Sequence, residues 1–239
     1  MKIAVINPNT TASMTTAIGR VATATAAPGT EILAITSAAG PASIEGPYDG
    51  ALAVPGLLRE IARAEDAGAA AHVIACFDDT GLDAARSAAA APVIGIGEAA
   101  FHVASLVSHR FSVITTLSRS IPVIERNLAS YGLAKRCIRV RAAETPVLAF
   151  DEDLETAEKR LALEIEASLT DDHAEAVVLG CAGMTDLADR LSDRFGIPVI
   201  DGVRAAVTLA EALVRMKLVT SKTGAYAPPN PKAYVGLPQ

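Results

Sequence analysis

Two cysteines in similar sequence surroundings are the side chains of this chain best suited to chemistry. Cys76 ends the apolar segment HVIAC, and Cys181 ends the similar segment VVLGC. An unperturbed thiol has a pKa of about 8.5, so one member of a pair can be a thiolate while the other keeps its proton. Two such groups on opposite faces of a carbon beside a carbonyl can remove a proton from one face and return one to the other. The pair therefore predicts racemisation chemistry.

The residues that follow each cysteine favour the same interpretation. Each apolar segment leads through small or capping residues into a helical pattern. A thiol at the amino end of a helix gains from the helix dipole and from backbone N–H donors, which can also bind the oxygen of an enolate. Asp78 and Asp79 would raise the pKa of Cys76 if they faced it, and we expect at least one of them to cap a helix instead.

The other cysteine and the histidines have simpler interpretations. Cys137 has no counterpart in the other half of the chain and is expected to be a small buried hydrophobe. No C-x-x-C occurs, and His72, His102, His109 and His173 lie in no ligand spacing, so no metal site is predicted. His72 and His102 lie within apolar patterns and are expected to be packed or solvated.

Both reactive cysteines belong to an internal repeat. Segments 72–100 and 177–206 each contain an apolar segment of strand length, a cysteine, an amphipathic helical pattern and then Pro-Val-Ile. Cys76 precedes Pro92 by 16 positions, and Cys181 precedes Pro198 by 17. Further upstream, KIAVINP from residue 2 resembles RFSVITT from residue 110. The chain is therefore expected to consist of two similar halves.

Strands that alternate with helical patterns predict an α/β fold. We expect two pseudosymmetric domains, each with a mostly parallel sheet flanked by helices, and an active site in the cleft between them. Parallel sheets bind ligands at the carboxyl ends of their strands, so both thiols should point into that cleft. The predicted domains are residues 1–95, completed by 205–239, and residues 96–204. The helical pattern from Ala205 should pack back on the first domain, and the Pro-rich tail from Ala227 should lie at the surface.

Composition and charge restrict the partners. Apolar residues make up 51% of the chain but aromatic residues only 4%, which is typical of helices packed on a buried sheet. A net charge of −6 without a basic cluster argues against nucleic acid or an anionic membrane and for a small molecule. The apolar stretch 88–107 is divided by Pro92 and glycines, so it is not expected to span a membrane. The N-terminus lacks a signal-peptide pattern, so a cytoplasmic protein is expected. In that reducing compartment its cysteines should be free thiols.

Taken together, the motifs resemble the aspartate/glutamate/hydantoin racemase superfamily over the whole chain, and most of all its hydantoin racemase branch. No single motif is specific enough alone. The motifs are INPNTTASM from Ile6, GPASIEGPYD from Gly40, ACFDDTGLDAAR from Ala75, TTLSRS from Thr115, LGCAGM from Leu179 and PVIDGV from Pro198.

The resemblance implies an isomerase with no cofactor that racemises 5-monosubstituted hydantoins at C5. Cys76 and Cys181 fall at the positions of the family's acid and base. The family's proteins are usually homo-oligomers, so a dimer, tetramer or hexamer is expected. The resemblance also implies substrate contacts by these residues: Asn7, Ser43, Ile44, Phe77, Asp78, Thr115, Thr116, Ala182 and Gly183.

Alternative functions remain open. Allantoin racemases perform the same chemistry on a ureido-substituted hydantoin, and they often have Gly-Asp-Pro-Gly where this chain has Asp78-Asp79-Thr80-Gly81. The amino-acid racemases of the superfamily usually have C-N-T and C-T-H around their cysteines, whereas the flanks here suit a neutral ring. Related decarboxylases need a single cysteine, so two cysteines disfavour that reaction. A non-catalytic two-domain binding protein would need the cleft but not the thiols.

Overall fold

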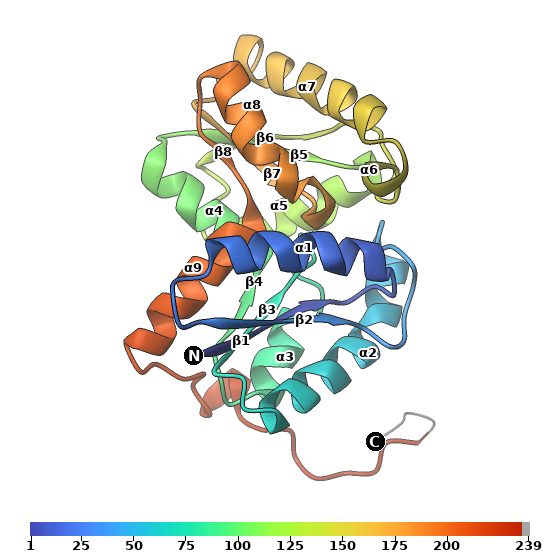
Figure 1. Cartoon of the computed structure of the whole chain (residues 1–239), viewed down its shortest axis with the longest axis vertical. Coiled ribbons are helices and arrows are strands. Elements are labelled where there is room, and N and C mark those ends of the chain that lie inside the picture. Colours follow the sequence, from blue (N-terminus) through green and yellow to red (C-terminus); the bar gives the residue numbers. More distant parts are fainter. Residues whose placement is uncertain (236–239) are drawn as a thin grey trace.

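The chain forms two stacked lobes, each built around a four-stranded parallel sheet with helices on both faces (Figure 1). The computed structural model describes residues 1–235. The strand orders are β2-β1-β3-β4 and β6-β5-β7-β8, so the strands of one lobe have counterparts in the other. The predicted α/β fold of two similar halves is confirmed.

The first lobe contains strands β1 (Lys2–Asn7), β2 (Glu31–Thr36), β3 (Ala71–Ile74) and β4 (Val93–Gly95). Its helices are α1 (Ala12–Thr25), α2 (Pro47–Asp66) and α3 (Leu82–Ala88). Successive residues of a strand face opposite sides of the sheet, and β1 shows this directly. Ile3 and Val5 pack in the core beneath α1, whereas Ala4 and Ile6 pack against α2 and α3.

The second lobe repeats this arrangement with β5 (Phe111–Thr115), β6 (Cys137–Ala142), β7 (Ala176–Gly180) and β8 (Val199–Ile200). Helices α4 (Ile96–Val107) and α5 (Ile121–Ser130) cover one face, and α7 (Leu154–Thr170) and α8 (Ala188–Phe195) cover the other. Shorter helices are η1 (Ser118–Ser120), α6 (Ala149–Glu152) and η2 (Ala182–Leu187). One hydrophobic cluster runs from the α1 side of the first sheet to the α4 side of the second and joins the lobes.

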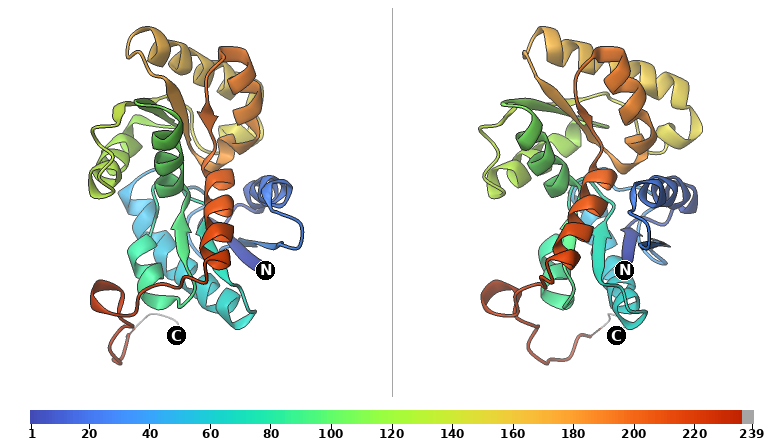
Figure 2. Two further views of the ribbon diagram at one scale, coloured as in Figure 1. Left: turned by 90° about the vertical axis from the view of Figure 1, so that its left-hand side faces the viewer. Right: turned by 60° about the vertical axis from the view of Figure 1, so that its left-hand side comes forward.

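Helix α9 (Gly202–Arg215) returns the chain to the first lobe, as Figure 2 shows. It packs on β3, β4 and α1 of the first lobe and also contacts α4. The segment after it, which includes η3 (Gly224–Tyr226), is held against α3: Thr220 hydrogen-bonds to the backbone of Ala90 and Ala91, and Lys222 Nζ donates to Arg86 O. On this basis we propose the domains 1–95 with 205–239, and 96–204; residues 236–239 lie outside the described part.

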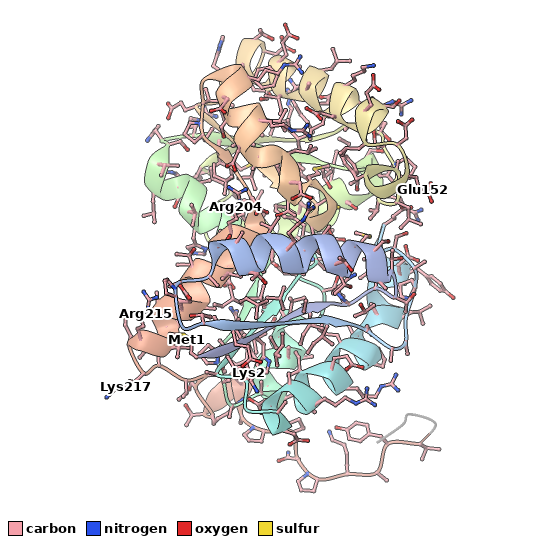
Figure 3. All side chains as sticks on the ribbon, in the orientation of Figure 1. Met1, Lys2, Glu152, Arg204, Arg215 and Lys217 are labelled. Carbon is pink, nitrogen blue, oxygen red and sulfur yellow. The ribbon has the colours of Figure 1, made fainter. Side chains whose placement is uncertain are left out.

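Charged side chains lie at the surface of both lobes. Glu152, Arg215 and Lys217 are exposed at the positions labelled in Figure 3. Among the helices of residues 1–235, none combines the length and apolar character that crossing a membrane requires.

Candidate active site

Cys76 lies two residues beyond the end of β3, in the loop that leads to α3. Its Sγ is 3.4 Å from Thr80 Oγ1 and also faces the backbone amide of Asp78. Phe77, the next residue, is buried with its ring edge-on to Phe101 of α4, at a centroid distance of 5.3 Å. The loop that carries the thiol is therefore held by packing against α4.

Asp79 fixes the same loop by capping α4. Its carboxylate accepts hydrogen bonds from the amides of Gly97 (2.9 Å) and Glu98 (2.8 Å) and from the Tyr131 hydroxyl (2.8 Å). This contact needs glycine, because a Cβ on Gly97 would lie 2.4 Å from Phe77 O. The expected aspartate cap exists, but it caps α4 rather than α3, whose N-cap is Gly81.

Cys181 lies at the equivalent place in the second lobe, directly after β7. It is the N-cap of η2, and its Sγ accepts a hydrogen bond of 3.3 Å from the amide of Gly183. Each thiol therefore meets the backbone amide two residues ahead: Asp78 for Cys76 and Gly183 for Cys181. The internal repeat thus places two sulfurs in matching local environments.

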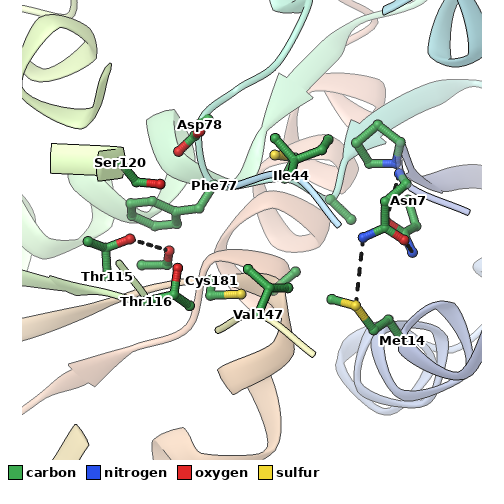
Figure 4. A pocket seen from close by; sticks show the side chains of 16 residues that line it. Asn7, Met14, Ile44, Phe77, Asp78, Thr115, Thr116, Ser120, Val147 and Cys181 are labelled. Atoms are coloured by element: carbon green, nitrogen blue, oxygen red, sulfur yellow. Dashed lines mark hydrogen bonds between the residues drawn. The ribbon is translucent and has the colours of Figure 1, made fainter. Parts of the chain in front are cut away.

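Both cysteines line one cavity of about 30 Å³ between the lobes, at the carboxyl ends of the central strands (Figure 4). Seven of the nine predicted substrate contacts line it as well: Asn7, Ile44, Phe77, Asp78, Thr115, Thr116 and Ala182. Ser43 and Gly183 do not line this cavity, although the Gly183 amide contacts Cys181.

The remaining lining residues were missed in the sequence, although most lie in the recognised motifs. Asn9 and Met14 belong to INPNTTASM, and Ser120 ends TTLSRS. Val147 lies in the loop between β6 and α6, which carries no sequence signal. The full set of missed residues is Pro8, Asn9, Met14, Ala75, Ser120, Val147 and Gly180.

The two ends of the cavity differ in polarity. Figure 4 shows Asp78, Ser120 and Thr116 on one side of Cys181 and Val147 on the other. Thr116 and Ser120 are buried residues that line the cavity, and among the described residues no hydrogen bond to their hydroxyls is found. A hydroxyl at a cavity wall that has no protein partner is available to a ligand, so this end suits the polar edge of a ligand.

The apolar end is formed by Ile44, Val147 and Met14. Asn7 also lies there, but its amide is used inside the protein: Nδ2 donates to Asn9 Oδ1 (2.8 Å) and to Thr15 Oγ1 (3.0 Å). Asn7 thus holds the loop after β1, as a turn-forming asparagine does. A direct substrate contact by its amide stays a prediction.

Burial dominates the electrostatics of the thiols. It raises the pKa of Cys76 to about 12, with the charge of Asp78 adding to the shift and the Thr80 hydroxyl opposing it. Burial likewise raises the pKa of Cys181 to about 12, opposed by the Gly183 amide. The expectation of thiols near their ordinary pKa is wrong, because one amide donor does not offset the loss of solvent.

Asp78 faces both thiols and a second cavity. Burial raises the pKa of its carboxyl to about 7, and nearby Arg126 lowers it. Its negative charge raises the pKa of Cys76 and Cys181 alike. The backbone carbonyl of Asp78 accepts a hydrogen bond of 2.9 Å from Asn127 Nδ2 of α5, which ties this loop to the second lobe.

The remaining cysteine and two of the histidines lie away from the cavity. Cys137 is half-buried on β6, and burial raises its pKa to about 12. His72 is fully buried in β3, and the His102 side chain is exposed on α4 with Nδ1 2.8 Å from Glu98 O. Among the described residues, no group of three or more His, Cys, Asp and Glu side chains is arranged to hold a metal ion.

The fold and the cavity define a class: a two-lobed α/β protein whose paired strand ends present two thiols to one interlobe cavity. Residues 3–210 match the family model described as Asp/Glu/Hydantoin racemase, and the chain belongs to this family. The family, together with hydantoin racemase relatives that are 41–52% identical, makes it an isomerase.

Similar proteins are known by sequence and by structure. The chain is 52% identical to a hydantoin racemase of Rhizobium meliloti, covering 99% of this chain and 98% of the relative. It is 46% identical to an allantoin racemase from Klebsiella pneumoniae, with a TM-score of 0.96 over 99% of this chain and 96% of the other. An allantoin racemase from Pseudomonas fluorescens is 41% identical, with a TM-score of 0.95 over 99% and 100% of the two chains.

Proposed function

We propose that this chain racemises 5-monosubstituted hydantoins at C5 by proton transfer between Cys76 and Cys181. The observation that carries the proposal is that both sulfurs line one interlobe cavity, each at the end of an equivalent strand. The 52% identity to a hydantoin racemase supports the choice of substrate.

The reaction needs one thiolate and one thiol. The thiolate takes the C5 proton, and the C–H electron pair moves onto the C4 carbonyl oxygen to give an enolate. The electron pair then returns to C5 as the other thiol donates its proton to the opposite face. One sulfur has gained a proton and the other has lost one, so the product state is ready for the reverse direction without any cofactor.

The polar end of the cavity suits the hydantoin ring. The ring carries two carbonyl oxygens and two N–H groups, which need hydrogen-bond partners once water is excluded. The free hydroxyls of Thr116 and Ser120 can donate to the developing enolate oxygen, and the Asp78 carboxylate can accept from a ring N–H. Stabilisation of that oxygen is worth about 10²-fold or more in rate per donor in comparable sites.

The test is racemisation of enantiopure 5-benzyl-, 5-isopropyl- and 5-ureidohydantoin, followed by polarimetry for the wild type, Cys76→Ser and Cys181→Ser. Each single variant should lose racemisation while its circular dichroism spectrum is unchanged. In deuterated solvent, each variant should keep exchange of the C5 proton of one enantiomer only. Binding of hydantoins without any solvent deuterium at C5 would show a binding protein instead.

Allantoin racemisation is the second candidate, because two allantoin racemases match at 46% and 41% identity. Allantoin is the 5-ureido member of the hydantoin series, so the same cavity and thiols would serve it. Activity confined to the ureido compound would select this candidate, and activity on the benzyl and isopropyl compounds would select the broader one.

The setting of the enzyme is part of the proposal. We propose a cytoplasmic homo-oligomer of two, four or six copies that uses no cofactor. All three cysteines are free thiols, which is typical of proteins in a reducing compartment. Sedimentation of the purified protein would give the number of copies.

A further inference from the structure

A second cavity adjoins the cysteine cavity between α1, α6 and η2. We call it the side chamber; its apolar lining consists of Met14, Ala17, Val147, Phe150, Leu154 and Leu187. Met14 and Val147 also line the cysteine cavity, so these two side chains form the wall between the two spaces. The chamber measures about 220 Å³ against about 30 Å³ for the cysteine cavity.

The dividing wall lies beside the Cys181 thiol. A Cβ built on Gly183 would lie 3.6 Å from Cys181 Sγ and 3.8 Å from Met14 Cε. Gly183 lines the side chamber. Because it has no side chain, no side-chain atom of residue 183 fills the space between the Cys181 thiol and the chamber. Met14 is an unbranched, adaptable side chain whose Sδ accepts a hydrogen bond from Asn9 Nδ2 at 3.6 Å. Of the two wall residues, Met14 is thus the one whose side chain can turn aside for a ligand group.

The outer side of the chamber is crossed by an ion pair between the lobes. Arg20 of α1 pairs with Asp186 of η2, and both side chains are partly exposed. The chamber therefore has apolar side chains next to the cysteine cavity and a charged rim at the solvent. Pockets of this kind bind apolar groups and orient them by a few polar contacts at the edge.

The other neighbouring cavity has more charged groups in its lining. It lies between α2 and α5 and meets the cysteine cavity at Asp78. Besides apolar side chains such as Val54, Leu82 and Val123, three carboxylates and one guanidinium line it: Asp78, Asp79, Asp83 and Arg126. An apolar group placed there would remove water from these charges, which is unfavourable. Apolar substituents thus fit the side chamber better.

Resting on the proposed function, we infer that the side chamber holds the C5 substituent of the hydantoin and selects large apolar substituents. The ring would keep its polar edge toward Thr116 and Ser120, and the substituent would pass between Met14 and Val147 into the chamber. The cysteine cavity, at about 30 Å³, is much smaller than the side chamber, at about 220 Å³, so a large substituent has more space in the chamber. Ala17 is the specificity-determining position, because the size of its side chain limits the volume of the side chamber on the α1 side.

The experiment compares three phenylalanine variants on two substrates, 5-methylhydantoin and 5-benzylhydantoin. Ala17→Phe fills the side chamber, Ala51→Phe fills the cavity between α2 and α5, and Thr23→Phe adds the same ring at an exposed position of α1. Initial rates are measured by polarimetry, with the rate without enzyme subtracted. Ala17→Leu is a smaller second variant, and circular dichroism checks the fold of each.

Ala17→Phe should lower kcat/KM for the benzyl compound by about tenfold or more and leave the methyl compound within about twofold. Ala51→Phe and Thr23→Phe should leave both substrates within about twofold. Equal effects of Ala17→Phe on both substrates would overturn the inference, as would selectivity caused by Ala51→Phe. If the wild type racemises neither compound, the proposed function itself fails, which is a different result from lost selectivity.

Discussion

The carboxylate of Glu45 accepts a hydrogen bond of 2.9 Å from the backbone amide of Val147, which lines the cysteine cavity. The two residues come from different lobes, and Ile44 and Val147 both line the cavity. The loop that carries Glu45 also contains Ala39 and lies close to α2. A Cβ on Gly56 of α2 would lie 2.1 Å from Ala39 O, so this close approach requires glycine. This bond therefore links the loop over the first lobe to the loop over the second.

Removal of that bond should weaken closure over the substrate. Hydrogen bonds to charged groups are worth about 1.5–3 kcal/mol, so we expect Glu45→Ala to lower kcat/KM by about tenfold, mainly through KM. Glu45→Gln keeps an acceptor oxygen and should lose less. Steady-state kinetics on one hydantoin distinguish the two variants, and Glu31→Ala, at an exposed position of β2, is the control. An equal loss in both Glu45 variants would assign the effect to charge.

Asp78 should govern the pH at which the thiols become active. Its charge raises the pKa of Cys76 and of Cys181, and its own pKa is about 7, so the effect operates above that pH. Because both thiol pKa values lie at about 12, we expect wild-type kcat/KM to rise with pH through the alkaline range.

Asp78→Asn removes the charge and should move the acidic limb of the kcat/KM profile to lower pH by about one unit. The measured quantity is the position of the limb, which a general loss of substrate binding would not move. Asp83→Asn is the control, since Asp83 lines the second cavity but not the cysteine cavity. A limb that stays in place or moves to higher pH would contradict this role for Asp78.

Tyr131 should stabilise the loop that carries Cys76. Burial raises the pKa of Asp79 to about 7, and the hydrogen bonds from Tyr131, Gly97 and Glu98 oppose that shift. A folded-state pKa above the unfolded value of about 3.9 means that this carboxyl costs stability as the pH rises from about 4 to about 7. Without the Tyr131 hydroxyl the Asp79 pKa rises further, so the loss of stability continues above pH 7.

Tyr131→Phe should therefore lower the free energy of unfolding by about 1.5–3 kcal/mol at pH 9 and by less at pH 5. Urea unfolding at both pH values, followed by circular dichroism, measures the difference. Tyr226→Phe is the matched control, because its hydroxyl donates to the exposed Asp83 at 2.9 Å and its removal should cost under about 1 kcal/mol. A larger loss at pH 5 than at pH 9 would be inconsistent with an ionised Asp79.

The sequence predicted the parts of the site that repeat in the two halves. Cys76 and Cys181 were found because an apolar strand, a cysteine and a helical pattern recur, and the fold maps both onto equivalent strand ends. The seven predicted residues that line the cavity lie close to strand ends, or in the loop after β2, where parallel sheets bind ligands.

The contacts between the lobes could not be predicted from local patterns. Val147 lies in a loop, and its place in the cavity depends on how one lobe packs on the other. The choice of helix that Asp79 caps also depends on packing, since α4 begins 17 residues later in the chain. Burial raises the pKa of both thiols, and a repeat in the sequence does not reveal how deeply its residues are buried.

His72 should make stability fall in acid. Its side chain is fully buried in β3, and neither ring nitrogen has a hydrogen-bond partner within the described chain; Glu65 Oε1 is 3.5 Å from Nε2, too far for a good bond. Burial lowers the pKa of His72 below its ordinary value, against the opposing charge of Glu65. The folded state therefore keeps the ring neutral where the unfolded chain takes up a proton.

The unfolded state binds the extra proton below about pH 6.5, so the His72 contribution to stability is full above that pH and is lost as the pH falls toward its folded-state pKa. We expect His72→Leu to be as stable as the wild type at pH 8, because it also removes two buried unpaired nitrogens. Below about pH 6.5, the free energy of unfolding of the variant should rise relative to that of the wild type by up to about 1.4 kcal/mol for each pH unit.

Urea unfolding from pH 8 to pH 5 measures this difference. His102→Leu, at an exposed position of α4, controls for the loss of an imidazole. A gap between His72→Leu and the wild type that is the same at pH 8 and pH 5 would show that His72 does not titrate differently in the folded and unfolded chains.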